Sequence, residues 1–176
     1  MKLSLQKISC LAPGAGQVFI SENLASLFAI SGKKTLLVDA DLRKGHLAKK
    51  FGIDGNTGLS QILLHNEPID SAICKTTVEN LELIPCGETP SNPAELLSSK
   101  RYLMVIEELA KRYDLVVINT PSLALAADAI SACRAASQIA MVLESKKHSI
   151  EAIKNGAAQL RMSNADAHVS VVLNKC

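Results

Sequence analysis

Short apolar runs alternate along the chain with longer segments of helical period. The short runs predict strands near residues 5–10, 34–39, 81–85, 114–118, 137–143 and 168–173. Three of them, TLLVDAD, YDLVVINTP and SVVLNK, are rich in β-branched residues and end in turn formers, as central strands do. The pattern predicts an α/β protein whose parallel strands are covered on both faces.

The intervening segments have the period of amphipathic helices. Long helices are predicted for QVFISENLASLFAIS, which ends before Gly32, for KRYLMVIEELAKRYD and for HSIEAIKNGAAQLRM. Their expected inward positions are Val18, Leu24, Leu27 and Phe28, then Leu103, Ile106, Leu109 and Ala110, then Ile150, Ile153, Ala157 and Leu160. Shorter helices are predicted at 58–65, 93–98 and 126–135, whereas 44–58 fits either a short helix or a mobile loop.

Composition narrows the class of protein. The 176 residues suit one domain, 1–176, and the absence of Trp, with two Tyr and three Phe, predicts an aliphatic core. Nineteen basic and seventeen acidic residues give no reason to expect nucleic acid as a partner. The five scattered cysteines predict reduced thiols, and the four histidines lie too far apart to predict a metal site. No apolar run reaches the ~18 residues of a membrane span, although the chain can still be the cytoplasmic part of a larger membrane protein.

A glycine loop at Pro13-Gly14-Ala15-Gly16 lies between the first strand and the first helix. The N-terminus of a helix attracts anions through its free N–H groups and its dipole, but a glycine turn here can also simply make a tight corner. Asp39 and Asp41 end the second strand, and Asn119 ends a buried strand. Because parallel strands end at one edge of a sheet, the three segments are expected to meet in one crevice.

The chain resembles a known family, the bacterial tyrosine kinases of exopolysaccharide and capsule synthesis, which are related to septum-site and plasmid-partition ATPases. The resemblance rests on LLVDADLRKG, GLSQILL, NLELIPCGETPSNPAELLSS, YDLVVINTPSL, DAISACRAASQIAMVLE and VVLNK, which follow one another over nearly the whole chain. It implies a P-loop NTPase-like fold, a three-layer α/β/α sandwich around a mostly parallel sheet. It also implies that the glycine-loop residues Pro13, Gly14, Ala15, Gly16, Gln17 and Val18 bind nucleotide together with Asn119.

The departures from the family pattern fall on the residues that carry its chemistry. The family has lysine and then serine or threonine where this chain has Gln17 and Val18, and aspartate where it has Asn119. The lysine supplies charge to the terminal phosphates, the hydroxyl binds magnesium, and the aspartate holds the water shell of the metal. The loop is therefore expected to keep the shape of a nucleotide site without its chemistry.

The carboxylates that the family uses in its second phosphate motif, Asp39 and Asp41, are retained as candidate catalytic residues. The resemblance implies that one of these carboxylates acts on the attacking hydroxyl or on the metal. A strand-end aspartate can also cap the next turn, so a structural role stays open. Nearby Arg43 and Lys44, or Lys33, could replace the missing cation if the fold brings one of them to the phosphates.

The resulting functional prediction is a catalytically degenerate tyrosine-kinase-like domain that acts through protein contacts in exopolysaccharide chain-length control, polymerisation or export. No cofactor is expected; the alternative is an active kinase or partition-type ATPase that binds ATP or ADP with Mg²⁺. The expected partners are the polysaccharide co-polymerase and export machinery, or further copies of the chain. The expected place is the cytoplasmic face of the bacterial inner membrane, reached only through a fused or partner transmembrane protein. The family also carries a tyrosine-rich tail, whereas this chain has only Tyr102 and Tyr113.

Overall fold

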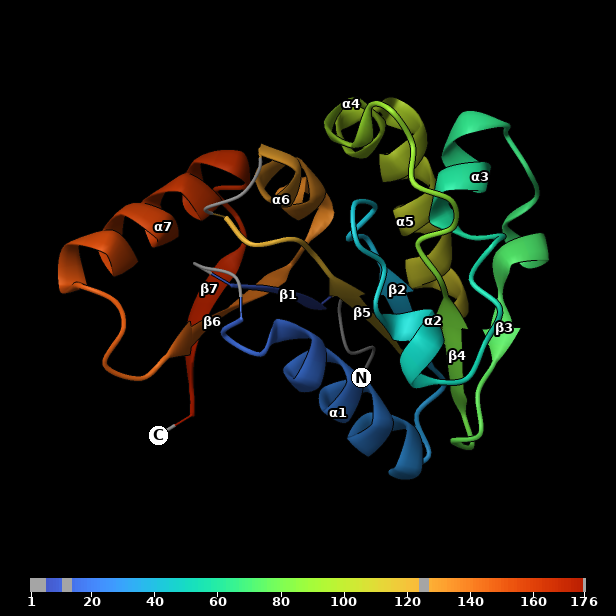
Figure 1. Cartoon of the computed structure of the whole chain (residues 1–176), viewed down its shortest axis with the longest axis horizontal. Coiled ribbons are helices and arrows are strands. Elements are labelled where there is room, and N and C mark those ends of the chain that lie inside the picture. Colours follow the sequence, from blue (N-terminus) through green and yellow to red (C-terminus); the bar gives the residue numbers. More distant parts are fainter. Residues whose placement is uncertain (1–5, 11–13, 124–126, 176) are drawn as a thin grey trace.

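A computed structural model describes residues 6–10, 14–123 and 127–175. Seven strands form one sheet in the order β3-β4-β2-β5-β1-β6-β7 (Figure 1). All neighbouring strands are parallel except the antiparallel β3–β4 pair. The strands are β1 Gln6–Cys10, β2 Thr35–Asp39, β3 Cys74–Lys75, β4 Leu81–Ile84, β5 Leu115–Asn119, β6 Gln138–Glu144 and β7 His168–Asn174.

Helices cover both faces of the sheet, which makes the predicted three-layer sandwich (Figure 1). One layer holds α1 and α2, and the other holds α3 to α7. The α-helices are α1 Gln17–Ile30, α2 Leu47–Lys50, α3 Leu59–Leu64, α4 Pro93–Ser98, α5 Lys100–Arg112, α6 Ala127–Ala132 and α7 Ile150–Ser163; η1 Ile69–Ala72 and η2 Cys133–Ala135 are 3₁₀ turns.

The six predicted strands all exist, and their ends agree with the prediction to within one residue. The prediction missed β3, whose two residues are too few to show an alternating pattern. The undecided segment 44–58 contains the short helix α2 followed by turns. The three long helices and the shorter ones at 58–65, 93–98 and 126–135 are confirmed over their described residues.

The inward face predicted for α1 is partly wrong. Its buried residues are Ser21, Ala25 and Ala29, while Leu27 is 66% exposed. Small side chains let the helix lie close to the sheet, so the larger apolar residues flank the contact line instead of occupying it. Ile150 was also predicted inward and is 73% exposed, because it is the first residue of α7 and lies beyond the packed part of that helix.

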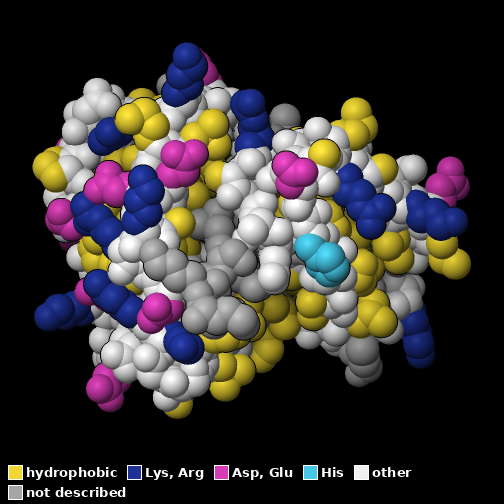
Figure 2. Space-filling model, turned by 180° about the vertical axis from the view of Figure 1, so that it is seen from behind, with side chains coloured by type: hydrophobic (Ala, Val, Ile, Leu, Met, Phe, Trp, Pro, Cys, Tyr) yellow, Lys and Arg dark blue, Asp and Glu magenta, His cyan; other side chains and the backbone are white. Residues whose placement is uncertain are grey.

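The core is aliphatic, as the composition predicts. Leu, Ile, Val and Ala dominate the two buried clusters on either side of the sheet, and the largest fully buried side chain is Tyr102. Basic and acidic side chains are interspersed on the face seen in Figure 2 and do not gather into a patch of one sign. Within residues 6–10, 14–123 and 127–175, every helix is too short or too polar to cross a bilayer.

Candidate functional site

The carboxyl ends of β1, β2 and β5 meet at one edge of the sheet, as the sequence predicts. Asp39 and Asn119 are paired residues in the β2–β5 register, and the glycine loop lies beside them before α1. A cavity of about 320 Å³ opens at this edge. Its lining residues are Gly14, Gly16, Gln17, Val18, Phe19, Asp41, Lys44, His46, Lys50 and Ser122.

The glycine loop needs its two glycines. Gly14 and Gly16 have φ of 83° and 97°, a region that side chains other than glycine rarely adopt. A Cβ on Gly16 would also collide with the side-chain amide of Asn174. Two donors at the end of β7 hold the loop: Asn174 Nδ2 donates to Ala15 O at 2.9 Å and Lys175 Nζ donates to Gly14 O at 2.7 Å. Pro13 lies outside the described residues.

A buried hydrogen bond joins two of the predicted site residues. Asn119 Nδ2 donates to Asp39 Oδ1 at 3.0 Å, and both residues are fully buried. The other Asp39 oxygen accepts Leu47 N–H at 3.1 Å, at the start of α2, and Asp41 N–H donates to Oδ1 at 3.3 Å. Asp39 therefore fills the turn-capping role that the sequence left open. Both of its oxygens accept hydrogen bonds, and it is not among the residues that line the cavity.

Burial controls the charge of this carboxyl group. It raises the pKa of Asp39 above its usual value, and the negative charge of Asp41 adds to the rise. The hydrogen bonds from Asn119 and from the Leu47 and Asp41 N–H groups oppose that rise. An amide at residue 119 is the right partner here, because a second carboxylate would leave two like charges about 3 Å apart in a dry site.

The substituted loop positions face the cavity. Gln17 and Val18 begin α1 and line its wall, where the family pattern has a cation and a hydroxyl. Neither an amide nor an isopropyl group carries charge, and only the amide could contact a metal through its oxygen. Asp41 is the one retained carboxylate among the lining residues. The structure thus brings together the predicted phosphate loop and Asp41, and it sets Asp39 behind them.

The structure distinguishes among the three basic residues considered as substitutes for the missing lysine. Lys44 lines the cavity, whereas Arg43 is not among its lining residues. Lys33 follows the far end of α1, which at 14 residues is about 21 Å long. Of these three residues, Lys44 is therefore the one that the fold places at the cavity.

Sequence reasoning missed Ser122, His46 and Lys50 as lining residues. The position of Ser122 just after a buried strand end is a signal that could have placed it at this edge. Cys86 also lies near this edge, as a free thiol that is half-buried. Burial and the nearby charges of Asp39 and Asp41 raise the pKa of the Cys86 thiol to about 11, so it stays protonated at neutral pH.

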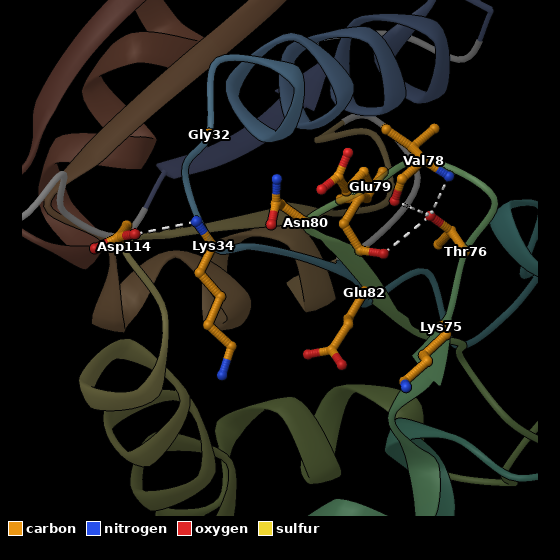
Figure 3. A pocket seen from close by; sticks show the side chains of 10 residues that line it. Gly32, Lys34, Lys75, Thr76, Val78, Glu79, Asn80, Glu82 and Asp114 are labelled. Carbon is orange, nitrogen blue, oxygen red and sulfur yellow. Dashed lines mark hydrogen bonds between the residues drawn. The ribbon is translucent and has the colours of Figure 1, made fainter.

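A larger cavity, of about 470 Å³, lies at the opposite edge, where β2, β4 and β5 begin. Figure 3 shows Lys34, Lys75 and Glu82 converging on its open space, so basic and acidic groups offset one another. Lys34 N–H donates to Asp114 Oδ2 at 3.0 Å, and Tyr113, beneath the Lys34 ammonium, donates to Glu82 Oε2 at 2.5 Å. Burial and the Glu82 contact raise the pKa of Tyr113.

Comparison with known proteins identifies relatives of this chain. Residues 8–167 match the family described as AAA domain. The tyrosine-protein kinase wzc of Salmonella typhimurium is 33% identical over 164 residues, which are 93% of this chain and 23% of that protein. The BceF tyrosine kinase domain is 34% identical with a TM-score of 0.82, covering 97% of this chain and 69% of that one.

Two further solved structures have the same fold. The chimerical protein CapA2B2 is 31% identical with a TM-score of 0.91, covering all of this chain and 77% of that one. The septum site-determining protein MinD of Pyrococcus horikoshii, at 23% identity, has a TM-score of 0.81, with 98% of this chain and 70% of that one covered. The predicted P-loop NTPase fold is confirmed. The chain spans about a fifth of the length of the first full-length kinases that it matches.

Proposed function

The chain belongs to the kinase-domain family of the bacterial tyrosine-protein kinases, and on that premise we propose that it is a catalytically degenerate member. It acts through protein contacts in exopolysaccharide chain-length control, polymerisation or export. Phosphoryl transfer is not part of this role.

One observation carries the proposal: the hydrogen bond from Asn119 to Asp39 at the place where the family pattern holds magnesium. The amide satisfies the buried carboxylate with a neutral donor, so the pair is stable without a cation. Loss of one preorganised donor to a transition-state charge costs about 100- to 1000-fold in rate. Gln17, Val18 and Asn119 together remove a cation and two groups that hold the metal.

The tyrosines support the same conclusion. Tyr102 and Tyr113 are the only two in the chain, and they are 0% and 5% exposed. The Tyr102 hydroxyl donates to Ala132 O, and that of Tyr113 to Glu82. Neither oxygen can reach the active site of a neighbouring subunit while the fold is intact, so neither of these two tyrosines is available for phosphorylation.

Protein contacts would use the apolar groups that the fold leaves exposed. Leu27 and Ile30 near the end of α1 are 66% and 71% exposed, and Leu173 on the edge strand β7 is 61% exposed. Figure 2 shows hydrophobic side chains reaching the surface on the side of β6, β7 and α7. The proposed partners are the co-polymerase and export machinery at the cytoplasmic face of the inner membrane, or other copies of the chain. The membrane is reached only through a fused or partner transmembrane protein.

The test is calorimetric titration of the domain with Mg-ATP and Mg-ADP, repeated on the combined Gln17→Lys, Val18→Thr, Asn119→Asp variant. The proposal expects magnesium-dependent binding only in the repaired variant. An ATPase and tyrosine-phosphorylation assay with a soluble tyrosine peptide accompanies both proteins. Magnesium-dependent turnover by the unmodified domain would overturn the proposal.

The alternative is an active ATP-binding tyrosine kinase or partition-type ATPase with substitute residues, and the position of Lys44 in the cavity wall favours it. In that case the unmodified domain hydrolyses Mg-ATP and Lys44→Met abolishes the activity. Lys33→Met is the matched control, because it removes the same charge at the far end of α1.

A further inference from the structure

Strand β7 forms one edge of the sheet, and no strand among the described residues pairs with its outer side (Figure 1). The hydrogen bonds to β6 show which of its backbone groups are used. His168 N–H donates to Ser137 O, and Asn174 O accepts Ser145 N–H, both at 3.0 Å. The backbone groups of successive residues in a strand point to opposite sides, so every second residue from His168 to Asn174 faces β6.

Val169, Val171 and Leu173 are the residues of β7 whose N–H and C=O groups point to the open side. Their side chains all lie on the face of the sheet that α7 covers, because Val169 packs against the same core cluster as Ile153 of that helix. Val171 and Leu173 are 49% and 61% exposed. The open edge thus combines unpaired backbone groups with an exposed apolar row, which is a template for another β-strand.

The two edges of the sheet differ in how they are protected. β3, at the other edge, has only two residues, and one of them is the exposed Lys75. Short edge strands and lysines are devices by which native proteins prevent pairing between sheets. β7 has seven residues, HVSVVLN, and none of them is a lysine, arginine, aspartate, glutamate, proline or glycine. Its sequence therefore lacks the features that oppose the addition of a strand.

The sequence of β7 is complementary to itself in one antiparallel register. When Val171 of one copy lies opposite Val171 of a second copy, Val169 of each copy lies opposite Leu173 of the other. Each of these three opposed pairs exchanges two backbone hydrogen bonds, and the six side chains form one apolar row. No acids, lysines or arginines are brought together within the strands. A register shifted by one residue would place the outward groups opposite residues whose backbone groups face β6.

We propose that two copies of the chain associate through β7 in this antiparallel register, about a two-fold axis at Val171. The seven strands of each copy then form one continuous sheet. A two-fold contact uses the same surface on both copies and closes on itself. The interface is small, so we expect a dissociation constant in the micromolar range. This inference rests on the proposed function, because it supplies one of the protein contacts through which the domain is proposed to act.

The experiment measures the mass of the whole chain by sedimentation over a range of concentrations, with a reductant that keeps the cysteines from forming disulfides. Wild type is expected to change from monomer to dimer as its concentration rises. Val171→Lys sets two ammonium groups opposite each other at the axis and should weaken dimerisation at least about tenfold. Leu27→Lys is the matched control, because it changes another exposed apolar residue to lysine on α1, and it should leave dimerisation unchanged.

A second measurement uses wild type alone and follows amide hydrogen exchange below and above the concentration at which the dimer forms. Dimerisation should slow exchange at the N–H groups of Val169, Val171 and Leu173. Exchange at Ser170 and Val172 should change little, because their N–H groups already face β6. This measurement tests strand pairing directly, and it still decides the question if Val171→Lys fails to fold.

A dimer that protects the three outward N–H groups and is weakened by Val171→Lys supports the proposal. A chain that stays monomeric at every concentration overturns it and leaves the edge to a strand from another protein. Protection of these N–H groups already in the monomer overturns it as well, because another segment of the chain then covers the edge. A dimer that Leu27→Lys weakens and Val171→Lys does not also overturns it. Failure of the proposed function differs from all of these, since it would appear as Mg-ATP turnover.

Discussion

The two cavities lie at opposite edges of one sheet, and the smaller one is the better functional candidate. At the amino edge, the cavity of about 470 Å³ is lined by two carboxylates that already accept hydrogen bonds: Asp114 from the Lys34 backbone N–H, and Glu82 from the Tyr113 hydroxyl. At the carboxyl edge, about 320 Å³ holds Ser122 and an uncapped helix with no such partners. A buried hydroxyl without a partner, and not size, distinguishes the candidate site from a hollow between elements.

The largest effect should come from Asn119→Asp alone, made without the cation that Gln17→Lys adds in the repaired variant. The new carboxylate would lie about 3 Å from the buried Asp39 and replace a donor with a like charge. We expect a loss of about 3–5 kcal/mol in the free energy of unfolding, measured in urea at neutral pH. Asn23→Asp, which adds the same charge on the exposed side of α1, should cost about 0.5 kcal/mol or less. Equal losses in both variants would contradict the buried contact.

Glycine-to-alanine substitutions can be compared at the two edges of the sheet. Gly16→Ala meets the Asn174 amide and has φ of 97°, so it should cost about 2–3 kcal/mol. Gly32→Ala at the amino edge has φ of 85° and open space, so it should cost only about 1 kcal/mol. Thermal unfolding measures both. Adding Asn174→Ala should recover part of the Gly16→Ala loss; no recovery would assign the whole cost to backbone strain.

Tyr113→Phe tests a contact at the amino edge of the sheet. It removes the hydroxyl that donates to Glu82 and should lower the free energy of unfolding by about 1–2 kcal/mol. Urea unfolding of both proteins at neutral pH measures this loss. A Tyr113→Phe variant as stable as wild type would contradict the contact with Glu82.

The smallest predicted effect is a pH dependence from Asp39. Its folded pKa is raised above the unfolded value, so the folded protein binds the proton more tightly. The contribution of Asp39 to stability is therefore fully present below pH 3.8 and is lost as pH rises through the raised pKa. Wild type should gain stability relative to Asp39→Asn as pH falls through that range, followed by the melting temperature of each protein. A difference that is constant with pH would contradict the raised pKa.

Much of the fold could be predicted because its signals are local. β-Branched runs placed the central strands, and the glycine at 32 ended α1. The orientation of α1 could not be predicted, because Leu27 and Ala25 differ in burial for a reason that lies in the sheet beneath them. Hydrophobicity ranks side chains by their own preference, whereas close helix–sheet packing selects for small size.

The sequence predicts at which edge of the sheet the candidate site lies. Asp39, Asn119 and the glycine loop were expected to meet because parallel strands end together. Their individual roles depend on contacts between distant residues: the Asn119–Asp39 hydrogen bond, the unpartnered Ser122 oxygen, and the Lys175 bond to Gly14. A pattern along the chain carries no information on which lone pair or proton is already used.

The bond from Lys175 to Gly14 spans 161 residues, and that from Asn174 to Ala15 spans 159. The loop leaves the ribosome before the donors that shape it, which lie 159 and 161 residues later in the chain. Closing so long a separation is entropically slow, so the loop acquires its final shape late in folding. A nascent chain halted before β7 would hold most of the sheet yet lack the two side chains that fix the glycine loop.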